Sequence, residues 1–148
     1  IMLPLSVQKF HKYEMEQNYK EVAEALGIYN LGNKYPSEIS GGQQQRTAAA
    51  RAFVHKPTII FADEPTGALD SKSAQDLLHR LEDMNKQFNS TIMMVTHDPS
   101  AASYAERVIM LKDGDIHSEI YQGNDSKQTF YQEIMKLQTA LGGVTHDI

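Results

Sequence analysis

The stretch Thr58-Ile-Ile-Phe-Ala-Asp-Glu-Pro-Thr-Gly-Ala-Leu-Asp70 decides the fold class. Its apolar run, Ile59 to Ala62, does not alternate with polar residues, which is typical of a strand buried on both faces of a parallel sheet. Pro65 then ends the strand pattern, and Gly67 permits a turn. We therefore predict an α/β fold, with a mostly parallel sheet and helices on both of its faces.

Two carboxylates, Asp63 and Glu64, follow this strand directly. Ligands of open α/β sheets bind beyond the carboxyl ends of the strands. The pair is therefore placed to hold a cation and to polarise a water molecule. Two solvated acids at the end of a strand would produce the same pattern, so the interpretation depends on two further features of the chain.

The first feature is Ser40-Gly41-Gly42-Gln43, at the start of a predicted helix that runs to Val54. Glycines let the backbone approach a ligand closely, and the first-turn N–H groups of a helix favour an anion. A serine cap on an ordinary helix would also explain the segment. The carboxylates downstream favour phosphate binding.

The second feature is His97, which follows another apolar segment, Thr91 to Thr96. We predict a second buried strand there. Asp98 and Pro99 then match the cap and the first position of a helix. His97 is therefore expected in a strand-to-helix turn near the same edge of the sheet as Glu64. A lone histidine in such a turn more often has a structural role than a chemical one.

The remaining elements follow from apolar periodicity and turn residues. An Asp113-Gly114 pair between two strand patterns predicts a hairpin. Apolar residues at steps of three and four predict amphipathic helices, with the opposite face, including Asp76 and Arg80, in solvent. The predicted helices cover residues 13–26, 43–54, 71–88 and 126–141, and the hairpin strands cover 107–112 and 115–121.

Composition narrows the class of protein. The 148 residues are 41% hydrophobic and 22% charged, as in an ordinary globular domain. The chain has no cysteine, which excludes a disulfide framework and a thiolate metal site. The net charge of −5 argues against nucleic acid as a partner, because that needs a basic face. No apolar run approaches the roughly 18 residues that span a bilayer, so a membrane role requires a partner.

Taken in order, these motifs resemble the nucleotide-binding subunit of an ABC transporter. Ile39-Ser-Gly-Gly-Gln43 resembles the signature motif, with isoleucine where leucine is usual. Ile59 to Asp63 resembles the Walker B strand, and Glu64 matches the catalytic glutamate that follows it. Gly67-Ala-Leu-Asp70 matches the D-loop, and His97 matches the switch histidine.

The resemblance implies Mg-dependent ATP hydrolysis by a homodimer that closes head to tail around two nucleotides. Asp63 would help to hold Mg, and Glu64 would act as the general base. His97 would bind the γ-phosphate, and Asp70 would lie at the dimer seam. The residues that would reach the nucleotide of the second copy are Ser40, Gly41, Gly42 and Gln43.

One part of the family pattern is missing from the sequence. No Gly-x-x-x-x-Gly-Lys-[Ser/Thr] phosphate loop (Walker A) occurs between Ile1 and Ile148, and the Q-loop that follows it is absent too. Both are expected upstream, so the chain resembles the C-terminal part of the P-loop NTPase fold. We expect a helical subdomain with the signature at 1–55, the C-terminal part of the ATPase core at 56–125, and a helix and tail at 126–148. Alone, this chain is expected to be marginally stable and inactive.

The segments around the signature and Walker B motifs resemble the lipoprotein-release, macrolide-export and antimicrobial-peptide branch of the family. The tail, Phe130-Tyr-Gln-Glu-Ile134 and Leu141-Gly-Gly143, resembles its bacitracin-resistance group. This implies a transmembrane permease as partner and a cytoplasmic position, peripheral on the inner face of the cell membrane. The alternatives are a non-hydrolysing docking module and a fragment of a DNA-repair-type ATPase, and the acidic charge counts against the latter.

Overall fold

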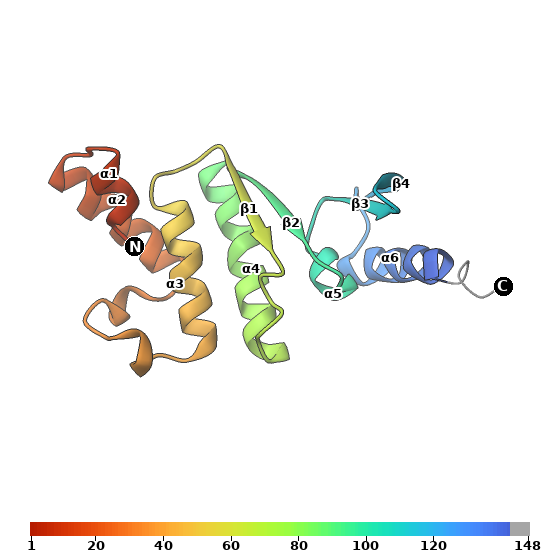
Figure 1. The fold of residues 1–148 in the computed structure, drawn as a ribbon, viewed down its shortest axis with the longest axis horizontal. Coiled ribbons are helices and arrows are strands. Elements are labelled where there is room, and N and C mark those ends of the chain that lie inside the picture. Colours follow the sequence, from red (N-terminus) through yellow and green to blue (C-terminus); the bar gives the residue numbers. More distant parts are fainter. Residues whose placement is uncertain (143–148) are drawn as a thin grey trace. The chain divides into compact units, whose positions relative to one another are not determined.

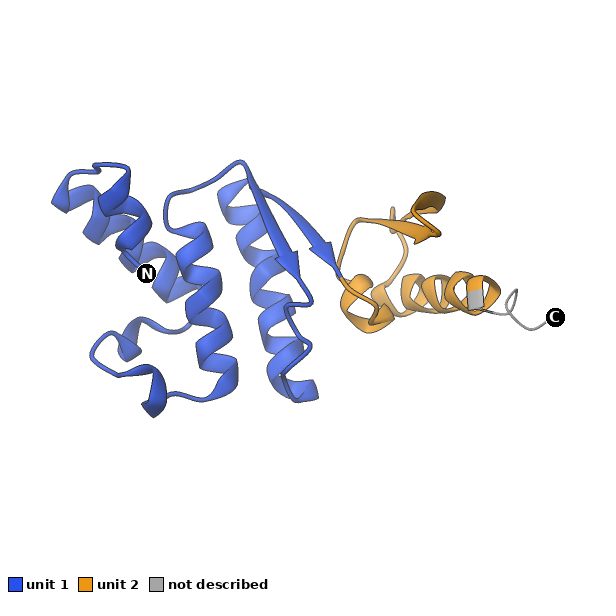
Figure 2. Ribbon diagram, viewed as in Figure 1, with its two compact units in different colours: residues 1–95 blue, residues 96–148 orange. Residues whose placement is uncertain are grey.

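A computed structural model describes residues 1–142 and divides the chain into two compact units, residues 1–95 and 96–148 (Figures 1 and 2). The domain boundaries predicted at residues 55 and 125 stay predictions, because a division into compact units does not test them. No helix among the described residues is both long and apolar enough to cross a membrane. The first unit comprises α1 (Leu3–Val7), α2 (Lys12–Ala25), the 3₁₀ turns η1 (Tyr29–Leu31) and η2 (Pro36–Glu38), α3 (Gly41–Phe53), β1 (Ile59–Asp63), α4 (Ser71–Phe88) and β2 (Thr91–Val95).

The sheet of the first unit is a parallel pair joined by α4, as the sequence predicts. The register pairs Ile59 with Thr91 and Asp63 with Val95. The ladder extends beyond the strand, because the Glu64 amide donates to the Val95 carbonyl at 2.8 Å. Both strands therefore end at the same edge, which is where the predicted carboxylates lie.

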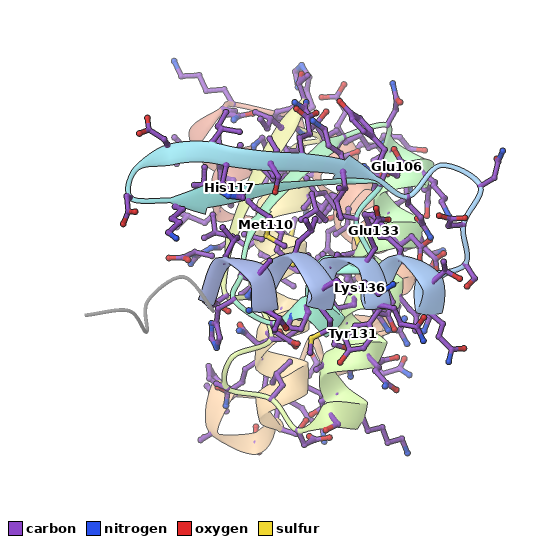
Figure 3. The ribbon with its side chains drawn as sticks, turned by 90° about the vertical axis from the view of Figure 1, so that its right-hand side faces the viewer. Glu106, Met110, His117, Tyr131, Glu133 and Lys136 are labelled. Atoms are coloured by element: carbon purple, nitrogen blue, oxygen red, sulfur yellow. The ribbon has the colours of Figure 1, made fainter. Side chains whose placement is uncertain are left out.

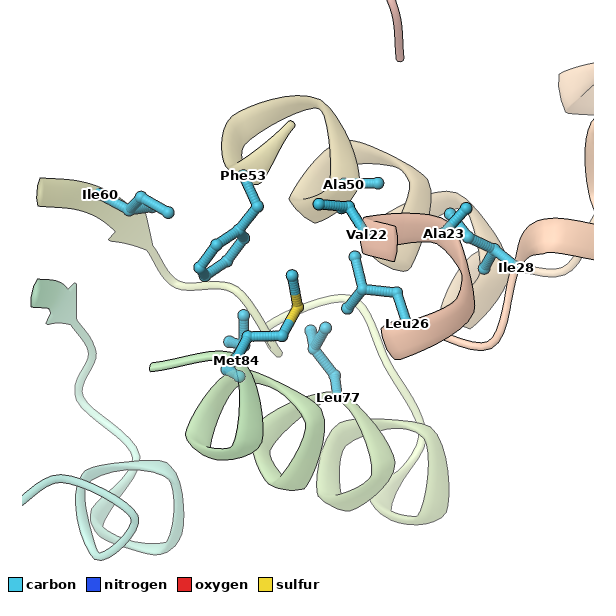
Figure 4. Close-up of a cluster of buried hydrophobic side chains, with 10 residues drawn as sticks. Val22, Ala23, Leu26, Ile28, Ala50, Phe53, Ile60, Leu77 and Met84 are labelled. Atoms are coloured by element: carbon cyan, nitrogen blue, oxygen red, sulfur yellow. The ribbon is translucent and has the colours of Figure 1, made fainter. Parts of the chain in front are cut away.

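The core of this unit lies between the sheet and the helices α2, α3 and α4 (Figure 4). Burying an aliphatic or aromatic side chain of this size contributes about 1.5–3 kcal/mol, so the cluster is the main source of stability. Its members are Val22, Ala23, Leu26, Ile28, Ala50, Phe53, Ile60, Leu77, Leu81 and Met84.

The prediction that both strands are buried on both faces is wrong for this structure. Ile60 is buried, but the opposite face of the sheet is exposed, with 47% of Ile59, 72% of Phe61, 50% of Met93 and 60% of Val95 accessible. The helical core packs on the Ile60 side, and within the first unit the second face of the sheet is left exposed. A sheet of only two strands thus leaves an apolar face accessible to solvent.

The second unit combines α5 (Pro99–Ala102), the hairpin of β3 (Arg107–Lys112) and β4 (Asp115–Tyr121), and α6 (Lys127–Gly142). Asp113 and Gly114 turn the hairpin with φ of +54° and +89°, as their sequence predicts. Figure 3 shows the hairpin, with Met110 and His117, running beside α6, which carries Lys136. The Lys112 ammonium donates to the Leu141 carbonyl of α6 at 3.4 Å. The buried side chains of α5 and α6 are Ala101, Phe130 and Ile134.

Candidate functional site

The carboxyl end of β1 carries Asp63 and then Glu64. Asp63 is exposed at the last position of the strand, and Glu64 is half-buried. The backbone of Glu64 has a φ of +42°, in the left-handed region that side chains other than glycine rarely adopt. Such strain costs about 1–3 kcal/mol and persists only where the surrounding structure imposes it. The ladder bond to Val95 helps to impose it here.

The loop after Glu64 is held by hydrogen bonds within the loop and by one from α3. The Gly67 amide donates to the Glu64 carbonyl at 3.1 Å, and the Leu69 amide donates to the Thr66 carbonyl at 3.0 Å. The Gln45 side-chain amide donates to the Pro65 carbonyl at 3.1 Å, across 20 positions of sequence. The loop that follows the carboxylates is therefore held by the helix that follows the signature.

Asp70 ends this loop and caps α4. Its carboxylate accepts from the amides of Lys72 at 3.1 Å and Ser73 at 3.0 Å. Hydrogen bonds from the Ser73 hydroxyl, and then from these backbone amides, hold the pKa of Asp70 below its usual range. The side chain that we predict at a dimer seam thus also fixes the first turn of α4.

The signature segment, Ser40–Gln43, begins α3 with a capping box. The Gln43 amide donates to Ser40 Oγ at 3.3 Å, and the Ser40 amide donates to Gln43 Oε1 at 2.9 Å. Ser40 is therefore a helix cap, the structural role that its sequence allows. Because Ser40 Oγ accepts in this bond, it keeps its own proton for donation to a ligand oxygen. Ser40 and Gly41 are exposed and Gly42 is buried.

Gly42 is buried because it lies against α4. A Cβ added to Gly42 would lie 3.1 Å from Ser73 Oγ and 3.2 Å from Ser73 Cβ, whereas one added to Gly41 would meet nothing within 4 Å. The structure thus brings the signature segment and Asp70 together through Ser73. The sequence contains no signal for this contact beyond the glycine itself.

An ionic group beside this contact was missed by the sequence reasoning. The Arg46 guanidinium lies 2.5 Å from the Asp76 carboxylate, which also accepts from Arg80 at 3.2 Å. The expectation that Asp76 and Arg80 lie in solvent holds only in part, since their side chains are 41% and 31% exposed and share these contacts. The spacing of Asp76 and Arg80 on one helix is a usable signal. The ion pair of Asp76 with Arg46, 30 positions away, has no comparable signal in the sequence.

His97 lies in the second unit, in the predicted turn before α5. The Gln138 side chain donates to the His97 carbonyl at 3.1 Å. The Ser100 amide donates to the Asp98 carboxylate at 2.8 Å, and Pro99 is the first helical residue, so the predicted cap is confirmed. The approach of His97 to Glu64, which belongs to the first unit, stays a prediction.

The described residues form no nucleotide-sized pocket around the predicted site residues. A hollow of about 200 Å³ lies beside β1, lined in part by Gln45, Asp63 and Pro65. Ligand pockets typically measure about 300–1,000 Å³, so this hollow alone does not enclose a nucleotide. A larger hollow, of about 800 Å³, is lined by Tyr19, Tyr29 and Lys34 among others and contains none of the predicted site residues.

The carboxylates fit magnesium better than a metal held by protein alone. Residues 1–142 contain no cluster of three or more potential metal-binding side chains. Magnesium is usually held by one or two carboxylates together with substrate phosphates and water, which matches an exposed Asp63 at the end of a strand.

Comparison with known proteins identifies the family. A family model described as "ABC transporter" matches residues 3–67. The bacitracin export ATP-binding protein BceA of Halalkalibacterium halodurans is 58% identical over 99% of this chain and 58% of its own length. The ABC transporter ATP-binding protein YxdL of Bacillus subtilis is 49% identical over the whole chain and 57% of its own length. The chain therefore spans little more than half the length of these relatives.

Among solved structures, the ATP-binding cassette MJ0796, of Methanocaldococcus jannaschii, matches with a TM-score of 0.67 and 37% identity. That match covers 82% of this chain and 54% of the other, in a dimeric post-hydrolysis state bound to ADP and Pi. Sequence and fold agree, so the chain belongs to the ABC transporter ATP-binding proteins and has part of the fold of their P-loop NTPase cassette.

Proposed function

We propose that this chain supplies the Walker B, signature and D-loop side of an ATP-hydrolysing site that drives a membrane permease. The observation that carries the proposal is the position of Asp63 and Glu64 at the carboxyl end of β1. Glu64 is held there in a left-handed conformation by its ladder bond to Val95. Strain that the surrounding structure maintains is typical of functional sites.

Each carboxylate has a distinct role in this proposal. Glu64 accepts the proton of the attacking water through its carboxylate, as a general base. Asp63 holds magnesium, which neutralises charge on the nucleotide's phosphates when it is bound. His97 donates a hydrogen bond to the γ-phosphate and orients the water.

The second copy of the chain completes the site from the opposite side. The Ser40 hydroxyl donates a hydrogen bond to the γ-phosphate held by the partner. The backbone of Gly41, Gly42 and Gln43 lies along the same phosphate. Asp70 lies at the seam between the copies. The dimer of the MJ0796 cassette supports this arrangement.

The phosphate loop must come from outside residues 1–148, so this chain alone is expected to be inactive. The partner is a transmembrane permease, and the protein works on the cytoplasmic, inner face of the cell membrane. The similarity to a bacitracin export protein supports antimicrobial-peptide export or resistance as the transport function.

The test is Mg-dependent ATP binding and hydrolysis, measured for this chain and for the protein extended upstream along its reading frame. We expect activity in the extended protein only, and Glu64→Gln in that protein is expected to bind ATP with almost no turnover. Activity in neither protein would favour a non-hydrolysing docking module. Activity in the 148-residue chain would contradict the composite site.

A further inference from the structure

One face of α4 holds the helical part of the first unit through a packing contact at Ser73 and polar contacts at Asp76 and Arg80. These positions lie three and four residues apart, so they share one side of the helix. Ser73 meets Gly42 at the start of α3, and Asp76 binds Arg46 one turn further along the same helix. α3 and α4 therefore contact each other at two successive helical turns.

Arg80 extends these contacts to α2. Its Nη1 donates to the Ala25 carbonyl at 2.9 Å, at the C-terminal end of that helix. Its guanidinium lies 3.0 Å from where a Cβ on Gly27 would be, and Gly27 has a φ of +64°. A residue with a side chain at this position would be strained and would displace Arg80, so glycine both ends α2 and admits the arginine.

Asp76 is the centre of this group because both arginines bind its carboxylate. Arg46 Nη1 lies 2.5 Å from Asp76 Oδ2, and Arg80 Nε lies 3.2 Å from both Asp76 oxygens. The Arg46 side chain is only 16% exposed, and its Nε is buried with no hydrogen-bond partner among the described residues. Removal of the Asp76 charge would leave this largely buried cation without its counterion, which is costly unless α3 shifts.

We infer that Arg46, Asp76 and Arg80 are positioning residues that set the angle at which α3 presents the signature segment to the nucleotide of the second copy. The inference rests on the proposed function, because it concerns the side of the site that acts in the dimer. None of these side chains touches the nucleotide. They act by fixing α3 and the end of α2 on α4, whose own start is capped by Asp70.

The test uses Asp76→Asn in the extended protein, which keeps the shape of the side chain and removes its charge. Asp76→Glu restores the charge. The matched control is Glu21→Gln, which removes another ion pair of the first unit, that of Glu21 on α2 with Lys56 in the loop after α3, at 2.8 Å. Each variant is made with and without Glu64→Gln, because slow hydrolysis preserves the ATP-bound dimer.

Two readouts separate positioning from general stability. The first is the affinity of the monomer for a fluorescent ATP analogue, and the second is ATP-dependent dimerisation by analytical ultracentrifugation. We expect Asp76→Asn to leave the affinity within about twofold and to weaken dimerisation about tenfold, the effect of losing one charge-assisted hydrogen bond. Asp76→Glu should recover most of the dimerisation, and Glu21→Gln should match the parent protein.

Dimerisation of Asp76→Asn equal to that of the parent, or an equal loss in Glu21→Gln, would overturn the inference. Where Asp76→Asn does not fold, as judged by its melting curve, Arg46→Gln decides by the same two readouts. A parent protein that neither binds ATP nor dimerises would overturn the proposed function itself. That result is distinct, because it appears before any variant is compared.

Discussion

Gly42 and Ser73 lie so close that a single methyl group on the glycine would press on the serine, 3.1 Å from its hydroxyl oxygen. This contact joins the first turn of α3 to the first turn of α4. Ser73 also donates its backbone amide to Asp70 at 3.0 Å. The signature segment and the end of the D-loop are therefore parts of one packed unit.

The first prediction concerns that contact. Gly42→Ala should lower the free energy of unfolding by about 1–3 kcal/mol, because overpacking forces the two helices apart. Gly41→Ala is the matched control, since its Cβ would meet nothing within 4 Å. It should leave the stability unchanged or raise it by up to about 1 kcal/mol, through helix propensity. Urea unfolding followed by circular dichroism measures both, and equal effects would refute the importance of the contact.

The sequence predicted elements that depend on local patterns. The hairpin at Asp113-Gly114, the cap at Asp98 and the helix from Ser71 to Phe88 are each specified by neighbouring residues, and all are confirmed. The left-handed backbone of Glu64 was not predicted, because glutamate rarely adopts it. The ladder bond to Val95, which helps to hold this conformation, joins residues that are distant in the sequence. An apolar run also does not reveal which face of a strand stays uncovered, as Phe61 illustrates.

The candidate site likewise combines residues that local sequence predicts with contacts that it does not. Asp63, Glu64 and Ser40 are predicted as site residues from their neighbours in sequence and from a family pattern. The contacts of Arg46 with Asp76 and of Gln45 with Pro65 join positions 30 and 20 residues apart, and no local pattern specifies them. These contacts depend on how helices pack, which a single sequence does not display.

The second prediction separates two roles of Asp70. Asp70→Ala should lower the melting temperature because α4 loses its cap, whereas Asp70→Asn should lower it much less, since asparagine caps almost as well. Both should weaken ATP-dependent dimerisation if the carboxylate lies at the seam. Normal dimerisation of Asp70→Asn would limit the residue to its capping role.

The ionisation of Asp70 should also make the free energy of unfolding depend on pH. Hydrogen bonds from Ser73 and Lys72 lower its pKa below the ordinary value of 3.8, so the folded state favours the ionised carboxylate. Its contribution to stability is fully present above that value and is lost as the pH falls through the lower pKa of the folded state. Unfolding titrations of the parent and of Asp70→Asn should therefore converge below that window, and a constant difference between them would contradict the assignment.

The third prediction concerns the uncovered sheet face. Phe61 and Val95 are 72% and 60% exposed, and exposed apolar patches promote association. The 148-residue chain should self-associate with rising concentration, and Phe61→Lys should reduce the association measured by light scattering. Tyr13→Lys changes a residue that is 73% exposed on α2, away from this face, and serves as the control. An equal effect of the two variants would indicate nonspecific association.

The fourth prediction tests whether the backbone of Glu64 is strained. Glu64→Ala and Glu64→Gly both remove the carboxylate, so each should abolish hydrolysis. They differ in the backbone, because glycine accepts a φ of +42° without the cost that alanine bears. Glu64→Gly should therefore be more stable than Glu64→Ala by about 1 kcal/mol in urea unfolding. Equal stability would show that the left-handed conformation carries no strain, and turnover in either variant would remove Glu64 from the role of general base.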